Sequence, residues 1–185
     1  MQYAHPRPAD RVKSIEWAQG VLVDVGRYVV LDSETTGLDP TDEVIQLAVL
    51  GPDGTALLDT YIKPLVRKQI PAAAMAIHHI SMTMLANAPS YVEVAPQLRS
   101  VIGDRAIICY NADYDKRLLA QTARLCKIEF IGGNWQCAMK QYARFRGDWD
   151  ARKNDYRWAR LPSGDHSALG DCRATLSIVE LMAKG

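Results

Sequence analysis

The sequence predicts an α/β protein built around one core. Three apolar, β-branched runs occur early in the chain and are separated by turn residues, which predicts a meander of strands. Helical periodicities then alternate with one further apolar run, and no internal repeat or low-complexity tract interrupts the pattern. With 185 residues, of which 48% are hydrophobic, the chain is long enough to bury such a core.

The first part of the chain predicts an arm, a helix and three strands. Residues 1–8 carry two prolines and predict a mobile arm, and residues 9–19 follow with apolar side chains at helical spacing and Asp10 as a candidate cap. Strands are expected at residues 28–33, 44–50 and 56–62. The Gly-Pro-Asp-Gly sequence at 51–54 predicts a tight turn between the last two strands.

Helices dominate the rest of the chain. Apolar residues at helical spacing predict helices over residues 72–77, 83–87, 91–102, 114–126, 137–145 and 169–183. Pro71 stands where the first of these helices begins, a position at which its missing N–H costs nothing. An apolar run over residues 105–110 predicts one further strand. The order of elements is that of an α/β mixture rather than of a solenoid.

Composition argues against several classes of protein. Charged residues such as Asp24 and Asp32 break the apolar runs, so we expect no membrane span, and the first residues contain no apolar stretch typical of a signal peptide. The cysteines lack CxxC spacing, which favours free thiols over a disulfide or zinc site. They are Cys109, Cys126, Cys137 and Cys172. These features favour a soluble cytoplasmic protein.

The first candidate site is the Asp32-Ser33-Glu34 sequence at the end of the first strand. Strand side chains alternate, so Asp32 and Glu34 point to one side and Ser33 to the other, where it says little about the chemistry. Two carboxylates on one face of a buried strand repel each other unless a cation lies between them, and Mg²⁺ prefers such oxygen ligands. The alternative is that both are polar side chains where the strand emerges into solvent.

Two further candidate sites lie at junctions between elements. At the start of the helix after residue 110, either Asp113 or Asp115 could cap the helix while the other binds a metal, and the spacing leaves this open. At the start of the last helix, His166 precedes Asp171 by five residues, although a histidine there is more often a surface residue. Together, four carboxylates and a histidine predict a two-metal site that hydrolyses phosphodiesters, with the imidazole taking a proton from water.

Three ordered motifs resemble the DnaQ-like, DEDDh class of 3′–5′ exonucleases. They are Asp32-x-Glu34-Thr-x-Gly-Leu, Asn111-x-x-Tyr114-Asp115 and His166-x-x-x-x-Asp171. The class includes the proofreading subunit of bacterial DNA polymerase III, oligoribonuclease and RNase T. The resemblance covers about residues 28–182 and implies a ribonuclease H-like fold, a mixed five-stranded sheet flanked by helices. Its fifth strand is expected at residues 129–131.

The resemblance also implies a role for each acidic residue. The four implied metal ligands are Asp32, Glu34, Asp115 and Asp171. They would hold two divalent cations, Mg²⁺ or Mn²⁺, and His166 would be the general base. The Asn-x-x-aromatic-Asp pattern of the family selects Asp115 over Asp113. Residues 28–185 would form the exonuclease domain, and residues 1–27 an N-terminal arm and helix.

The same resemblance implies which residues contact the substrate. They are Thr35, Thr36, Gly37, Leu38, His79, Asn111 and Tyr114. Gly37 would let the backbone approach the sugar of the terminal nucleotide, and Leu38 would wedge against the last base. The sequence His78-His79-Ile80 is similar to the His-Gly-Ile segment of the family, with His79 in place of the glycine. His79 is either a substrate contact or a polar helix end.

The net charge of +1 hides an uneven distribution. Residues 1–115 carry a net charge of −5, whereas residues 116–160 carry +7 and include tryptophan and tyrosine side chains between the basic ones. Basic side chains neutralise phosphates, and aromatic rings stack on unpaired bases. This stretch is either a solvated basic surface or the path of a single strand. Residues 147–163 have few aliphatic side chains and are expected to form a mobile segment near the substrate.

The leading hypothesis is a metal-dependent 3′–5′ exonuclease that releases nucleoside monophosphates from single-stranded DNA by two-metal-ion hydrolysis. Its expected partner is single-stranded nucleic acid, with DNA favoured over RNA. The alternatives are an exoribonuclease that acts on short RNA or RNA tails, and a non-catalytic nucleic-acid-binding module. The enzyme could form a homodimer or dock to a larger DNA-processing complex, and no membrane partner is expected. The sequence leaves open whether its setting is proofreading, repair, RNA turnover or end trimming.

Overall fold

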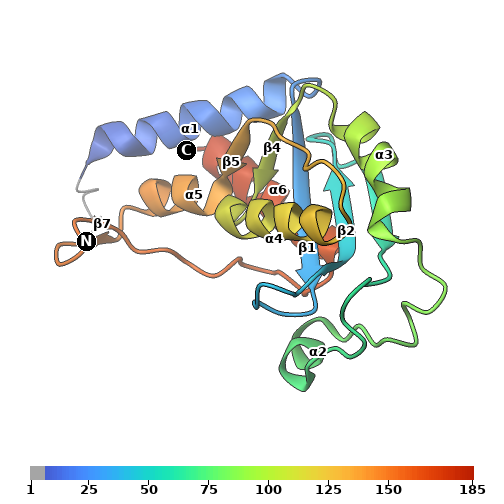
Figure 1. The fold of residues 1–185 in the computed structure, drawn as a ribbon. Helices are drawn as coiled ribbons and strands as arrows, with labels where there is room; N and C mark the ends of the chain where they lie inside the picture. The colour runs from blue at the N-terminus through green and yellow to red at the C-terminus, as the bar shows by residue number, and fades with distance from the viewer. Residues whose placement is uncertain (1–6) are drawn as a thin grey trace.

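The computed structural model describes residues 7–185 and has a mixed five-stranded sheet at its centre (Figure 1). The strands are β1 (Tyr28–Thr35), β2 (Val44–Leu50), β3 (Ala56–Tyr61), β4 (Ala106–Cys109) and β5 (Trp135–Cys137). Their order in the sheet is β3-β2-β1-β4-β5. β2 pairs antiparallel with β1 and β3, whereas β4 pairs parallel with β1 and β5. The predicted fold class is confirmed, and β1 is the central strand.

Helices cover both faces of the sheet (Figure 1). They are α1 (Pro8–Val23), α2 (Ala72–His78), α3 (Tyr91–Ile102), α4 (Ala112–Leu125), α5 (Ala138–Arg146) and α6 (Ala168–Ala183). α3 and α4 pack on one face and α1, α5 and α6 on the other, while α2 lies apart from the sheet. Two short strands, β6 (Trp149–Asp150) and β7 (Asp155–Tyr156), form a separate ribbon.

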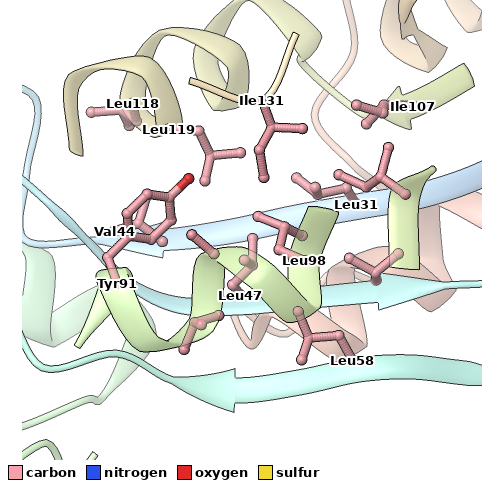
Figure 2. Packing of buried hydrophobic residues seen from close by; sticks show 14 of the residues in the cluster. Leu31, Val44, Leu47, Leu58, Tyr91, Leu98, Ile107, Leu118, Leu119 and Ile131 are labelled. Carbon is pink, nitrogen blue, oxygen red and sulfur yellow. The ribbon is translucent and has the colours of Figure 1, made fainter. Parts of the chain in front are cut away.

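The alternation of side chains along β1 divides the core into two layers. Val29 and Leu31 belong to the layer under α3 and α4, whereas Val30 belongs to the layer under α1, α5 and α6. Figure 2 shows the first layer, in which Leu31, Leu98 of α3 and Leu119 of α4 gather in one cluster. Full burial of one leucine side chain contributes about 1.5–3 kcal/mol, so this layer fixes α3 and α4 against the sheet.

The strands and the turn of the meander form where the sequence predicts them. Gly54 adopts a left-handed conformation with φ 84°, and the Gly51 N–H donates a hydrogen bond to the Thr55 carbonyl at 2.8 Å, which closes the turn between β2 and β3. β1 extends two residues beyond the predicted end and includes Glu34 and Thr35. Asp32 and Glu34 therefore both belong to a regular strand.

Two predicted elements differ from the structure. Residues 83–87 form turns rather than a helix. A helix of five residues has little stability of its own, and Leu85 is buried against Ile45 and Ile80 without one. The fifth strand lies at Trp135–Cys137 rather than at residues 129–131, because these are the residues that pair with β4.

The N-terminal segment also differs in detail. Residues 1–6 of the predicted arm lie outside the described residues, and α1 begins at the last residue of that arm. Asp10 is not the cap, because Arg7 precedes the helix and Asp10 lies in its first turn, where its carboxylate accepts a hydrogen bond from the Tyr156 hydroxyl at 2.9 Å. α1 packs along α5 and α6. A division of the chain after this helix stays a prediction.

The segment between α5 and α6 contains more regular structure than predicted. In the β6–β7 ribbon, the rings of Trp149 and Tyr156 pack edge to face with their centroids 5.0 Å apart. From the ribbon, the chain runs along one side of the molecule to the start of α6 (Figure 1). The Tyr110 hydroxyl donates a hydrogen bond to the Ala159 carbonyl on this path at 2.9 Å. The sequence does not predict the ribbon, because each of its strands has two residues.

Two findings concern membranes and thiols. Across residues 7–185, no helix combines the length and the apolar character needed to cross a bilayer. All four cysteines are free thiols, of which Cys109 and Cys172 are buried. The fold is therefore held together by packing and hydrogen bonds without a disulfide.

Candidate active site

Asp32 and Glu34 lie on the same side of β1 toward its carboxyl end. They stand opposite Ala48 and Gln46 of β2. Both carboxylates are partly buried, and no donor among residues 7–185 forms a hydrogen bond with either of them. The central strand thus presents two carboxylates without protein partners at the end where ligands of α/β folds commonly bind.

α4 brings Asp115 to the same place. Asp115 lies in the first turn of this helix and is 3% exposed, and the Ser33 hydroxyl donates a hydrogen bond to its Oδ1 at 2.8 Å. Asp113, in the same turn, points outward and forms an ion pair with Lys140 at 2.7 Å. The structure therefore separates the two aspartates, and Asp115 is the one that faces β1.

Ser33, whose place in the sequence says little about chemistry, contacts Asp115 in the structure. Its side chain points to the face opposite Asp32, as the alternation of a strand requires, but α4 packs on that face. The hydroxyl there orients the Asp115 carboxylate. Sequence spacing could not reveal this contact, because the two residues are 82 positions apart.

The start of α6 completes the cluster. Ser167 caps the helix through a side-chain hydrogen bond, and Asp171 lies in the first turn. Oδ1 of Asp171 accepts hydrogen bonds from the backbone N–H groups of Asp165 and His166 at 2.9 and 3.2 Å, which folds the preceding loop toward this carboxylate. Ligand atoms of Glu34, His166 and Asp171 all lie within 4.8 Å of one another. Two segments far apart in the sequence thus meet here, and the charge of Asp115, from a third segment, acts on Glu34 at the same place.

The carboxyl groups of this cluster disfavour one another's charge. Burial, followed by the charges of Asp171 and Asp115, raises the pKa of Glu34 to about 8. Burial raises the pKa of Asp115 to about 7, although the hydrogen bond from Ser33 acts in the opposite direction. Burial and then the neighbouring carboxylates raise the pKa of Asp32 well above its usual value. As a set of anions, the cluster is therefore unfavourable without a bound cation.

These donors fit a divalent cation. The four carboxylates offer hard oxygen ligands, which Mg²⁺ and Mn²⁺ prefer to nitrogen or sulfur. Asp32 and Glu34 have no hydrogen-bond donors to compete for their oxygen atoms, and a cation beside them would favour the ionised form of every group in the cluster. The role of each residue as a ligand stays a prediction, which the geometry supports.

A cavity of about 370 Å³ adjoins the carboxylate cluster. Its walls are Glu34, the loop over residues 35–39, Asp42 behind that loop, Tyr114 of α4, and one face of α2 with Pro71 before it. The hydroxyl groups of Thr35 and Tyr114 are 3.1 Å apart, and the Leu38 side chain is 66% exposed. Because Glu34 belongs to both, a ligand in the cavity would lie next to the cluster.

The predicted substrate contacts are placed unevenly around this cavity. Most of the predicted loop lines it, but the Thr36 side chain is fully buried and its hydroxyl donates a hydrogen bond to Asp42 at 2.7 Å. Asn111 is partly buried at the N-cap of α4. His79 is exposed and is not part of the cavity wall, whereas His78 is.

His78 is a cavity residue that the predicted contacts do not include. It is buried, its Nδ1 accepts a hydrogen bond from the Ile80 N–H at 3.0 Å, and burial lowers its pKa. The imidazole is thus neutral at pH 7 with its proton on Nε2. His79 follows in a left-handed conformation with φ 57°, where glycine would fit without strain. The signal in the sequence was the His-His-Ile segment, whose first histidine matches the family.

A family model described as exonuclease, RNase_T, matches residues 29–179. The chain belongs to the exonuclease family. The matched region contains all three motifs of the carboxylate cluster. The motifs in the matched region are those of the DEDDh class, and the chain is a 3′–5′ exonuclease, an enzyme that hydrolyses phosphodiesters.

Relatives of this exonuclease differ widely in length. It is 36% identical to an uncharacterized exonuclease, CP81, of Escherichia phage 186, over 85% of this chain and 88% of that protein. It is 32% identical to a PolC-type DNA polymerase III of Thermotoga maritima, over 85% of this chain but only 12% of the polymerase. The chain therefore spans most of the phage protein and a small part of the polymerase.

Similar solved structures support the same fold for the exonuclease. Exonuclease X, in complex with 5′ overhanging duplex DNA, superposes with a TM-score of 0.60 and 26% identity, and covers 85% of this chain and 92% of that one. The nuclease domain of 3′hExo, a DEDDh family member bound to rAMP, superposes with a TM-score of 0.65 and 15% identity, with the same two coverages. The predicted ribonuclease H-like architecture is confirmed.

Proposed function

We propose that this exonuclease removes nucleoside monophosphates one at a time from the 3′ end of single-stranded DNA, using two divalent cations, Mg²⁺ or Mn²⁺. The observation that carries the proposal is the approach of Glu34, His166 and Asp171 to within 4.8 Å, with Asp32 and Asp115 beside them. Such a set of oxygen donors with an imidazole fits phosphodiester hydrolysis. A module that only binds nucleic acid would be free to lose these residues, and all five are present.

Each residue of the cluster has a task in the proposed reaction. The cation ligands would be Asp32, Glu34, Asp115 and Asp171. Bound cations would supply stabilisation of the attacking and leaving oxygens in an in-line displacement. His166 would take a proton from the attacking water while the bond between phosphorus and the 3′ oxygen of the preceding nucleotide breaks. Ser33 would keep Asp115 oriented through its hydrogen bond.

The cavity beside the cluster would receive the terminal nucleotide. Its volume of about 370 Å³ is within the range of small-ligand sites. A nucleotide there would bring its phosphate to Glu34, which belongs to both the cavity and the cluster. The exposed Leu38 side chain offers an apolar surface to the last base.

A basic and aromatic surface supports a single-stranded substrate. Lys140, Tyr156 and Trp158 line a depression between α5 and the ribbon, and Trp158 is 59% exposed. The chain then leads from Trp158 to His166 at the cluster. An exposed aromatic ring that stacks on an unpaired base contributes about 1–3 kcal/mol. The relationship to a PolC-type DNA polymerase III and to Exonuclease X, which was solved with DNA, favours DNA over RNA.

The substrate is tested by degradation of 5′-labelled DNA and RNA oligonucleotides of matched sequence, each single- and double-stranded, in Mg²⁺, Mn²⁺ or EDTA. We expect a descending ladder on single-stranded DNA in either metal and none in EDTA. If the folded protein cleaves none of these substrates, the proposed nuclease activity is contradicted. Faster degradation of RNA than of DNA would identify RNA as the preferred substrate. Tight binding of single strands without turnover would favour a binding module.

The residues are tested by a matched pair of variants, Asp115→Asn and Asp113→Asn. Both aspartates lie in the first turn of α4, but only Asp115 faces the cluster. The ladder should disappear with Asp115→Asn and persist with Asp113→Asn, with both proteins folded. An active Asp115→Asn would refute the assignment of this residue as a metal ligand.

A further inference from the structure

A second pair of buried carboxylates, outside the predicted metal ligands, lies directly before β2. Asp42 and Glu43 are 2% and 1% exposed. Burial of a charged carboxylate is unfavourable unless hydrogen bonds or cations replace the lost hydration. The partners of the two carboxylates therefore show what each holds in place.

Asp42 is tied to the loop that is predicted to contact the terminal nucleotide. Its Oδ1 accepts a hydrogen bond from the Thr36 hydroxyl at 2.7 Å, and its Oδ2 accepts one from the Asp39 N–H at 2.7 Å. Nε of Arg67 forms an ion pair with the same carboxylate at 2.8 Å. One side chain thus holds the loop at both of its ends.

Gly37 shows how closely the loop wraps around Asp42. A Cβ atom at this position would lie 2.6 Å from Oδ2 of Asp42, so the close approach requires glycine. α4 holds the same loop from another side, because Nε2 of Gln121 donates hydrogen bonds to the carbonyls of Asp39 and Asp42 at 2.8 and 2.6 Å. The loop therefore has little freedom to shift relative to Asp42.

Glu43 holds a different segment. Its carboxylate accepts hydrogen bonds from the backbone N–H groups of Leu65, Val66 and Arg67 at distances of 2.6, 2.8 and 2.8 Å. Residues 65–67 are not part of the cavity wall. Asp42 and Glu43 are thus alike in burial and in sequence position, but only the Asp42 side chain contacts the loop of the cavity.

We propose that Asp42 is a positioning residue, whose carboxylate holds the backbone of Thr36, Gly37 and Leu38 in the geometry that receives the 3′-terminal nucleotide. The inference rests on the proposed function. Leu38 is 66% exposed, so little packing of its own side chain fixes the tip of the loop, and the contacts behind it must do so. A loosened loop would weaken nucleotide binding and leave the cation ligands, which Asp42 does not contact, in place.

The test compares Asp42→Asn with Glu43→Gln in steady-state degradation of 5′-labelled single-stranded DNA with Mn²⁺. Each amide keeps the size of the side chain but replaces one acceptor by a donor and removes the charge. Asp42→Asn should raise KM about tenfold, the equivalent of one buried hydrogen bond, with kcat within about twofold. Glu43→Gln should leave KM within about twofold. The Mn²⁺ affinity without nucleic acid should be unchanged in both.

Thermal unfolding of the two variants separates positioning from stability. Both should unfold at a lower temperature than the wild type, so a KM change confined to Asp42→Asn has no explanation in lost stability. Arg67 lies outside the cavity wall, and Arg67→Gln removes the ion pair that it forms with Asp42. This variant should raise KM by about threefold. It provides the test if Asp42→Asn does not fold. An unchanged KM in both variants, or an equal rise in Glu43→Gln, would overturn the positioning role.

Measurements of DNA degradation and nucleotide binding by the wild type separate a failure of this inference from a failure of the proposed function on which it rests. If the wild type binds thymidine monophosphate in Ca²⁺ without degrading DNA, the same tenfold difference is expected in that affinity. If it neither degrades DNA nor binds the nucleotide, the proposed function is wrong and the positioning role falls with it. An active wild type with unchanged KM in the variants contradicts the positioning role alone.

Discussion

Two groups of buried carboxylates in this molecule differ in what surrounds them. Asp42 and Glu43 accept hydrogen bonds from hydroxyl and backbone amide groups of the protein, and Asp42 also forms an ion pair with a guanidinium group. Asp32 and Glu34 receive no hydrogen bond from the described residues, and burial and neighbouring charges raise their pKa values. The first group is complete within the protein, whereas the second lacks protein partners and would be completed by the proposed cations. We infer from this difference that the first group holds the fold and that the second is available to bind a ligand.

The largest effect should come from removing a charge from the incomplete group. Asp32→Asn should lower the exonuclease rate by about 10³-fold or more, because the proposed cations, which would stabilise the reacting oxygens, would lose a ligand. In EDTA the same variant should melt at a higher temperature than the wild type. An acid whose pKa is raised in the folded state opposes folding at every pH above its unfolded pKa, so its removal relieves that cost at pH 7.

Degradation rates and melting curves in EDTA measure these two effects of Asp32→Asn. A normal rate would show that Asp32 is no ligand. A lower melting temperature in EDTA would show that protein groups already satisfy this carboxylate, and the contrast between the two groups would disappear.

The next effect tests the hydrogen bond to Asp115, a neighbour of the incomplete group. Ser33→Ala removes the donor that orients the Asp115 carboxylate, and the affinity for Mn²⁺ should fall about 10- to 100-fold, as is usual when a supporting contact of a metal ligand is lost. The rate at saturating Mn²⁺ should largely recover. Titration of the rate with Mn²⁺ measures this, with Ser177→Ala, on the exposed side of α6, as the control. An unchanged titration would mean that Ser33 does not support the metal site.

A smaller effect should come from the complete group, where a substitution should lower the stability in EDTA, whereas Asp32→Asn should raise it. Glu43→Gln should lower the free energy of unfolding in EDTA by about 1.5 kcal/mol, because the amide cannot accept all three hydrogen bonds from residues 65–67. Denaturant titration measures this quantity. If Glu43→Gln and Asp32→Asn shift stability in the same direction, the two groups do not differ in the way described.

The smallest effect should come from His79, which belongs to neither group. His79→Gly should raise the free energy of unfolding by about 0.5–1 kcal/mol, because the residue adopts a left-handed conformation that is strained for histidine and not for glycine. Denaturant titration checks the stability, and KM should not change because His79 lies outside the cavity wall. A raised KM would instead support the predicted substrate contact of His79.

The incomplete group could be predicted from sequence because its signals are local. Asp32 and Glu34 follow the alternation of one strand, and the two further predicted ligands, Asp115 and Asp171, stand beside them at the first turns of two helices. The β2–β3 turn is equally local, since glycine supplies its left-handed position at Gly54. The resemblance to the DEDDh class then joined three short motifs into one site.

The remaining features depend on contacts between distant segments and could not be predicted. β5 has three residues and is a strand only because β4 pairs with it. Asp42 and Glu43 follow a turn and look like solvent-exposed polar residues in the sequence, because nothing near them shows that Arg67 and its neighbours will cover them. The same holds for Ser33, whose partner comes from α4.

Calorimetric titration of metal-free protein with Mn²⁺ is the most direct test of whether the group around Asp32 is a cation site. We predict two ions per chain for the wild type and for Asp42→Asn, and a loss of binding in Asp32→Asn. No binding to the wild type, or unaltered binding to Asp32→Asn, would contradict the division of the carboxylates into a group that holds the fold and a group that holds the metal.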